Sequence, residues 1–125
     1  MLYPGTVNED GEWSIYVVDE VLDWIRALDL PDRTRVSDAL DVLATVGPGL
    51  GRPLVDTIRG SVIANLKELR PGTVRILFAF DPWRSTILLV AGDKAGQWQR
   101  WYDEAIPLAE QRYQQYLNEH GAEED

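Results

Sequence analysis

The stretch LKELRPGTVRILFAF, residues 66–80, decides the fold, because two apolar segments flank a proline and a glycine. Val, Ile, Leu and Phe favour β-strands, and Pro71-Gly72 fits the central positions of a type II turn. The sequence therefore predicts two antiparallel strands, 63–70 and 74–80. Within this hairpin we expect Glu68 opposite Arg75, although a slip of one residue would exchange the two faces.

Residues on both sides of this hairpin repeat with the periods of strands and helices. The segments 13–18, 54–58 and 85–90 indicate further strands, while apolar residues at helical spacing predict helices from residue 19 to before Pro31 and from about 32 to 46. A third helical pattern begins near residue 97, and Pro107 either kinks it or opens a second helix. The expected fold class is α+β, with two N-terminal helices packed on a twisted antiparallel sheet and a C-terminal helical segment.

Length and composition bound the function. A chain of 125 residues fits one domain, residues 1–125, and we expect its ends, 1–12 and 120–125, to be flexible. With no cysteine and a single histidine, thiol catalysis, Cys-based zinc sites and His-pair metal sites are excluded. Residues 1–13 lack the pattern of a secretory signal, so the cytoplasm is the expected compartment.

Charge is distributed unevenly along the chain. The net charge is −9, yet residues 52–101 carry eight Lys/Arg against four Asp/Glu. Lys67, Arg70 and Arg75 lie around one tight turn of this basic middle. Clustered cations of this kind suit chemistry on a phosphate group, whereas the acidic flanks are equally typical of surfaces that only aid solubility.

The order of these motifs resembles the RelE/ParE superfamily of toxins from type II toxin–antitoxin systems, and more closely its phage-derived HigB-like branch. The resemblance is carried by Glu68-Leu69-Arg70, by Arg75-Ile76-Leu77, and by Gly92-Asp93-Lys94 followed by an aromatic helix. It implies a RelE-like fold and a toxin that cleaves mRNA on the ribosome, without metal or cofactor, and is neutralised by a cognate antitoxin protein. The implied catalytic residues are Lys67, Arg70, Arg75 and Lys94, and Trp98 and Tyr102 would bind the nucleotide.

Cleavage of RNA by its 2′-oxygen needs a proton acceptor and positive charge around the phosphorane. Lys67, crowded by arginines, is the candidate base, and Arg70 and Arg75 suit the growing phosphate charge. More ordinary roles are also open. Lys67 could be a solvated charge, Glu68 and Arg75 could form a cross-strand ion pair, and at least two of the aromatic residues Trp98, Trp101 and Tyr102 are expected in the core.

The sequence also departs from the family pattern. Many HigB-like chains are strongly basic and carry two adjacent lysines after the last strand, whereas here Lys94 precedes Ala95 and the chain is acidic. Two alternatives therefore stay open. One is a non-enzymatic inhibitor of DNA gyrase of the ParE type, binding through the helical hairpin, and the other is an inactive interaction module with the toxin fold.

Overall fold

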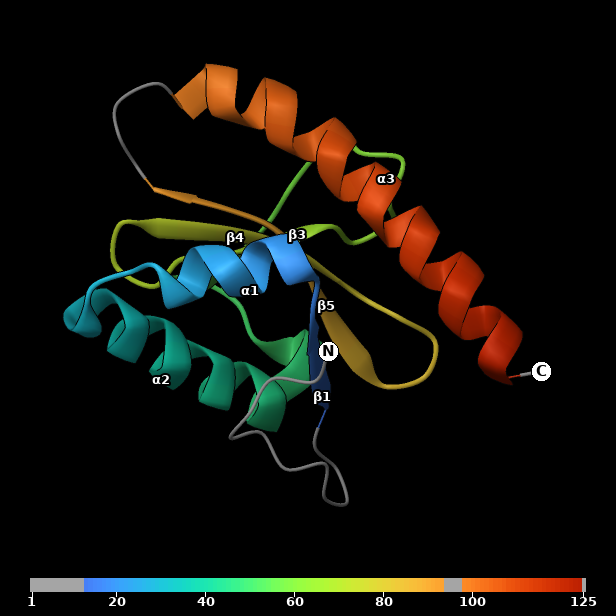
Figure 1. Cartoon of the computed structure of the whole chain (residues 1–125), viewed down its shortest axis with the longest axis horizontal. Helices are drawn as coiled ribbons and strands as arrows, with labels where there is room; N and C mark the ends of the chain where they lie inside the picture. Colours follow the sequence, from blue (N-terminus) through green and yellow to red (C-terminus); the bar gives the residue numbers. More distant parts are fainter. Residues whose placement is uncertain (1–12, 94–97, 125) are drawn as a thin grey trace.

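Five strands form a single sheet in the order β1-β5-β4-β3-β2 (Figure 1). The structure is a computed structural model that describes residues 13–93 and 98–124, with only the backbone described at 98 and 122–124. The strands have the following bounds: β1 Ser14–Val17, β2 Val55–Thr57, β3 Lys67–Leu69, β4 Val74–Phe80 and β5 Ser85–Asp93.

Helices cover both faces of this sheet. Helices α1 (Asp19–Arg26) and α2 (Leu30–Val46) pack on one face, and the long helix α3 (Trp98–Glu124) crosses the other (Figure 1). A short 3-10 turn, η1 (Gly47–Gly49), follows α2. The expected α+β class, with two N-terminal helices on a sheet and a C-terminal helix, is confirmed. No helix in the described part of the chain is long and apolar enough to cross a membrane.

The direction of β1 differs from the expected antiparallel sheet. Strand β1 runs parallel to β5, with Ser14 beside Ser85 and Val17 beside Leu88, while the other three pairings are antiparallel. Hairpin turns force neighbouring strands to be antiparallel, but β1 and β5 are joined through two helices and three strands. The long connection removes that constraint, and the sheet is mixed.

The turn between β3 and β4 lies one residue later than predicted. The Val74 N–H donates to the carbonyl of Pro71 at 3.1 Å, and Gly72 has a φ of 63°, in the left-handed region that glycine adopts without strain. Glu68 consequently pairs with Leu77 and not with Arg75, so the expected register was wrong. The slip is an even number of residues, and each side chain therefore keeps its predicted face.

Local contacts at its two ends explain where helix α2 begins and ends. The Asp29 carboxylate accepts the Asp32 N–H at 3.0 Å as an N-cap, and Pro31 occupies the first turn, where its missing N–H costs nothing. The helix thus begins two residues before the expected start. At its other end Gly47 has a φ of 69°, and an added Cβ would lie 2.6 Å from the Trp13 indole.

Strand β3 is shorter than the predicted 63–70, because Asn65 adopts a left-handed φ of 65° just before it. Helix α3 is longer than expected. It holds Pro107 inside one continuous helix and runs to Glu124, past residue 120, where we expected a flexible end. The expected flexible segment 1–12 lies outside the described residues.

Candidate active site

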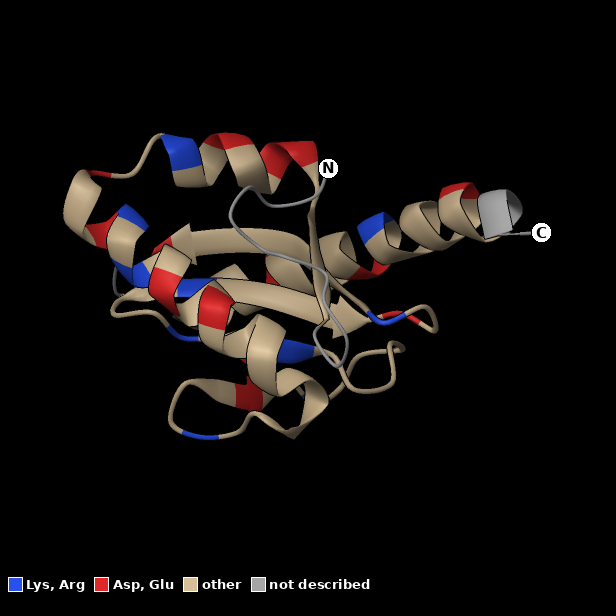
Figure 2. Cartoon of the chain, turned by 90° about the horizontal axis from the view of Figure 1, so that it is seen from below, with Lys and Arg blue, Asp and Glu red and all other residues tan. Residues whose placement is uncertain are grey.

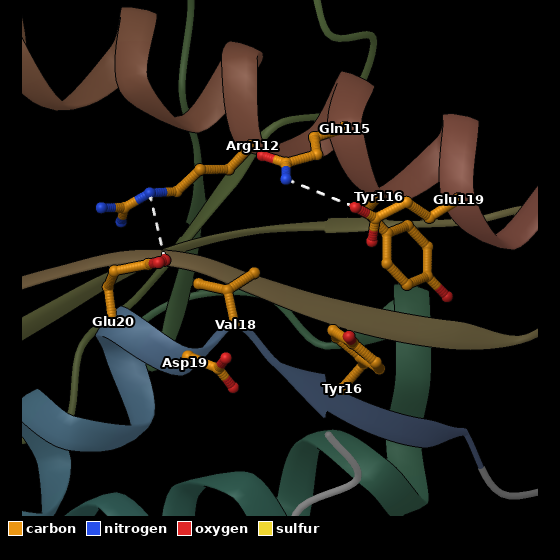
Figure 3. Close-up of a pocket in the computed structure, with 8 residues that line it drawn as sticks. All are labelled: Tyr16, Val18, Asp19, Glu20, Arg112, Gln115, Tyr116 and Glu119. Carbon is orange, nitrogen blue, oxygen red and sulfur yellow. Dashed lines mark hydrogen bonds and ion pairs between the residues drawn. The ribbon is translucent and has the colours of Figure 1, made fainter.

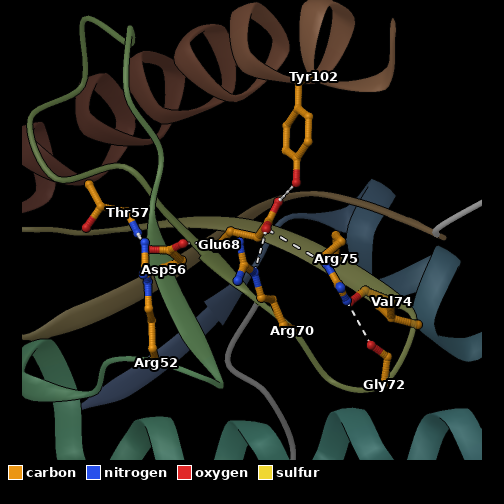
Figure 4. A network of polar contacts seen from close by, with 9 residues as sticks. All are labelled: Arg52, Asp56, Thr57, Glu68, Arg70, Gly72, Val74, Arg75 and Tyr102. Atoms are coloured by element: carbon orange, nitrogen blue, oxygen red, sulfur yellow. Dashed lines mark hydrogen bonds and ion pairs between the residues drawn. The ribbon is translucent and has the colours of Figure 1, made fainter. Parts of the chain in front are cut away.

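The fully buried carboxylate of Glu68 is the centre of a polar network on the α3 face of the sheet (Figure 4). Alternation along β3 sends Leu69 toward α1 and α2 and Glu68 toward α3, next to its apolar strand neighbour Leu77. A buried carboxylate is costly unless it is paired and hydrogen-bonded. Its hydrogen-bond and ion-pair partners therefore define the polar site on this face of the sheet.

Two side chains donate hydrogen bonds to Glu68, and a third forms an ion pair with it. Arg70 Nε lies 2.9 Å from Oε1 and Arg75 Nε lies 3.8 Å from the same oxygen, while the Tyr102 hydroxyl donates to Oε2. Figure 4 shows the three side chains converging on Glu68: Arg70 from just after β3, Arg75 from β4 and Tyr102 from α3. The ion pair expected between Glu68 and Arg75 is thus present, although it is diagonal in the register and not directly across.

The guanidinium of Arg75 is held on two sides. Besides Glu68, its Nη1 donates at 2.8 Å to each of the carbonyl oxygens of Gly72 and Val74. The side chain is only 13% exposed. Fixed donors that keep a positive charge in one place are what stabilise charge developing in a transition state.

Arg70 is more exposed and bridges two carboxylates. Its Nη2 lies 3.2 Å from Asp56 Oδ2, while its Nε is bound to Glu68. Asp56 on β2 pairs directly with Glu68 in the sheet, a like-charge pairing that would be unfavourable without a cation between the two. Asp56 also accepts from Arg52 Nε at 3.1 Å. Three arginines and two carboxylates therefore share this network.

Three members of the network, Asp56, Arg70 and Tyr102, have shifted pKa values. The hydrogen bond to Glu68 raises the pKa of Arg70. The hydrogen bond from Arg52, followed by that from the Thr57 N–H, lowers the pKa of Asp56 and keeps it ionised. Burial raises the pKa of Tyr102, and the hydrogen bond to Glu68 adds to the effect. Tyr102 consequently stays protonated at neutral pH and is not a base there.

Aromatic residues of α3 close this side of the site. The Trp101 indole packs on Gly92, where an added Cβ would lie 2.4 Å from its Nε1, and its ring centroid is 5.1 Å from that of Tyr102. Gly92 pairs with Arg75 in the sheet. Trp101 and Tyr102 are both partly buried against the core, as expected for two of the three aromatic residues.

The structure does not bring the remaining predicted residues into this network. Lys67 lies on the opposite face of the sheet, paired with Phe78, and its Nζ is 3.4 Å from the carbonyl oxygen of Pro48. Lys94 lies outside the described residues, and so does the side chain of Trp98, whose backbone opens α3. Arg70, Arg75 and Tyr102 are therefore the predicted residues that meet.

Sequence reasoning missed Arg52 and Asp56. Both lie near β2, and only the pairing of β2 with β3 brings Asp56 beside Glu68. The available signal was the spacing of four residues between them, which carries no meaning outside a helix.

A second polar cluster lies elsewhere on the α3 face. Arg112 Nε is 3.6 Å from Glu20 Oε2, at one side of a cavity of about 120 Å³ between α3 and the β1–α1 junction (Figure 3). Tyr16 and Tyr116 line it as well, and Tyr116 donates to the buried Asp81 at 2.6 Å. In the described ranges, no group of three or more His, Cys, Asp or Glu side chains could hold a metal ion.

Residues 23–114 match the protein family described as "Phage derived protein Gp49-like (DUF891)". Two relatives from Mycobacterium tuberculosis (strain ATCC 25618 / H37Rv) are named as toxins. HigB3 is 49% identical over 111 residues, which cover 86% of this chain and 97% of HigB3. HigB2 is 50% identical over 105 residues, covering 80% of this chain and 52% of HigB2.

Solved structures of RelE proteins share the fold. RelE from Pyrococcus horikoshii OT3, solved in complex with RelB, has a TM-score of 0.56 at 14% identity and covers 66% of this chain and 94% of its own. A mutant of E. coli RelE in the free state has a TM-score of 0.55 at 15% identity, covering 77% and 96%. The family match and the 49% identity to HigB3 show that the chain belongs to the Gp49-like phage-derived family as a HigB-like member, and the likeness to the RelE structures shows that it shares their fold.

Proposed function

We propose that this toxin is an endoribonuclease that cleaves mRNA on the ribosome and thereby inhibits translation. The observation that carries the proposal is the pair Arg70 and Arg75, both fixed on the buried carboxylate of Glu68. Permanently charged guanidinium groups in fixed positions favour the extra negative charge of a phosphorane. The relatives named as HigB toxins support the same reading.

In the proposed reaction the 2′-oxygen passes its proton to water and bonds to the neighbouring phosphorus. The bond from phosphorus to the 5′-oxygen breaks, and that oxygen takes up a proton from water. The products are a 2′,3′-cyclic phosphate and a 5′-hydroxyl. Arg70 and Arg75 stabilise the charge on the phosphoryl oxygens, and Lys94 adds a further cation. Lys67, on the other face of the sheet, does not touch the phosphate in this proposal.

The natural partner of such a toxin is an antitoxin protein. The RelE neighbour from Pyrococcus horikoshii OT3 was solved as a complex with RelB. For the present chain, an antitoxin that covers Arg70 and Arg75 would block the phosphate by charge and by bulk.

The test is growth and mapped mRNA 5′ ends after induction of the toxin without antitoxin. We expect the wild type to arrest growth and create new 5′ ends, and we expect Arg75→Gln to lower cleavage about 100-fold, as for loss of one transition-state donor. The matched control is Lys67→Gln, which removes one charge from the other face and should retain cleavage. Cleavage by Arg75→Gln at the wild-type rate would contradict the proposal.

Inhibition of gyrase is the second candidate. The observation that favours it is the outer face of α2, where Val42 and Val46 are 42% and 48% exposed. Figure 2 shows acidic residues distributed along the same hairpin of α1 and α2. In that case growth arrest would come without new mRNA ends, and Arg75→Gln would be as toxic as the wild type.

A further inference from the structure

Arg70 is bound by two carboxylates that differ sharply in burial. Glu68 is completely buried and takes the Nε of Arg70, whereas Asp56 is 22% exposed and takes its outer Nη2. Arg70 itself is 34% exposed. The inner carboxylate therefore fixes the direction of the side chain, and the outer one covers the part of the guanidinium that faces outward (Figure 4).

Asp56 is held by a second arginine as well. Arg52 Nε lies 3.1 Å from Asp56 Oδ1, and the Arg52 side chain is 77% exposed. The carboxylate thus lies between two guanidinium groups, and each of them contacts a different oxygen of Asp56. Two convergent arginines around one anion match the geometry in which arginine binds phosphate.

The ion pairs of Asp56 are easily exchanged. Pairs between partly exposed side chains contribute little to stability, because solvent screens them. Asp56 also lies directly across the sheet from Glu68, so two negative charges meet where only Arg70 separates them. Release of Asp56 to solvent would relieve that repulsion.

We propose that Arg52 and Arg70 form a binding subsite for an RNA backbone phosphate, and that the carboxylate of Asp56 occupies this subsite until RNA displaces it. The inference rests on the proposed action on RNA and adds to it one further phosphate ligand, Arg52, and one competing anion. It also accounts for how a chain of net charge −9 keeps arginines paired in the absence of RNA.

The proposed subsite and an ordinary ion pair predict opposite effects on RNA affinity when the Asp56 carboxylate is removed. Were Asp56 only a structural partner, its removal would loosen Arg52 and Arg70 and weaken RNA binding. As a competitor, its removal strengthens binding. Because a single partly exposed ion pair is displaced, we expect the gain in affinity to be about five-fold.

The experiment measures binding of a single-stranded 2′-O-methyl RNA oligonucleotide, which keeps every phosphate but cannot be cleaved through its 2′-oxygen. Asp56→Asn is compared with Asp41→Asn, which changes the net charge equally on the exposed face of α2. We expect the Kd to fall about five-fold for Asp56→Asn and to change little for Asp41→Asn. Adding Arg52→Gln to Asp56→Asn should cancel the gain and reduce the salt dependence by about one phosphate contact. Arg26→Gln, on exposed α1, is the control for that second change.

Equal effects of Asp56→Asn and Asp41→Asn, or weaker binding by Asp56→Asn, would overturn the proposal. Cleavage of mRNA in a translation reaction is measured separately, so an inactive but tightly binding protein would count against the nuclease and for the subsite. A further test uses the wild-type protein and therefore does not depend on whether a variant folds. Its Arg52 and Arg70 Nε–Hε NMR signals should shift on titration with the oligonucleotide, and unchanged signals would refute displacement.

Discussion

The two faces of the sheet are built from alternate residues of the same strands, yet they do different work. Toward α1 and α2 the strands present an apolar set such as Leu69, Ile76 and Phe78, all fully buried. Toward α3 the same strands present Leu77 and Leu89, but also Glu68, to which the phenol of Tyr102 on α3 donates. The first face is packed with apolar side chains, whereas the second also buries a charged group with its ion-pair and hydrogen-bond partners.

Removal of the Glu68 side chain is the most direct test of this difference between the two faces, and it has the largest expected effect on stability. We expect Glu68→Ala to lower the free energy of unfolding by about 3–5 kcal/mol, because Arg75 and Tyr102 lose a buried partner. Its neighbour on the other face provides the matched variant, since Leu69→Ala should lose about 2–5 kcal/mol through a cavity alone. Urea denaturation measures both. A loss below about 1 kcal/mol for Glu68→Ala would show that the network is not coupled to stability.

Alkaline pH should act on the α3 face. Burial raises the pKa of both Tyr102 and Tyr116, and each hydroxyl donates to a carboxylate. A raised pKa means that the folded state favours the neutral phenol. Its contribution is therefore complete below about pH 10, the pKa of an unfolded tyrosine, and declines as the pH rises above that value.

Tyr102→Phe and Tyr116→Phe test this contribution. Each should cost about 1–3 kcal/mol at neutral pH, because a carboxylate loses its donor. Above about pH 10 each variant should lose stability less steeply than the wild type, since one phenol no longer ionises. Unfolding followed at several pH values gives the slopes, and identical slopes for wild type and variants would contradict the assignment.

The smallest expected effect belongs to the other face. Asp29→Ala removes the N-cap of α2 and should lower stability by about 1 kcal/mol. Cleavage by the folded protein should stay unchanged. Asp41→Ala, in the middle of the same helix, controls for the charge, and a matching loss of stability there would mean that capping is not the cause.

Strand alternation and helical spacing were sufficient to predict the elements and the faces of their side chains. They were sufficient because burial alone decides those features. The register could not be predicted, since the position of Gly72 in the turn is fixed by where the backbone becomes left-handed. Alternation also shows why Lys67 lies apart. Residues three apart on a strand point to opposite faces, so nearness to Arg70 in sequence did not bring the two together.

The parts of the site that depend on distant strands were beyond the sequence. Asp56 reaches Arg70 only through the β2–β3 pairing, and Tyr102 reaches Glu68 across 34 residues. Neither contact follows from local propensity or periodicity, because each depends on the complete sheet and on the helix laid across it.

The parallel pairing of β1 with β5 also sets the order in which a newly made chain can mature. In the sheet of the described residues, β1 pairs with β5, whose first residue, Ser85, is 71 positions after Ser14. The N-terminal helices therefore wait for most of the sheet before their core can close, and such long-range contacts slow folding. Tyr102 arrives later still. During synthesis, Arg70 and Arg75 emerge before the helix that carries Tyr102, so the polar network around Glu68 is completed last.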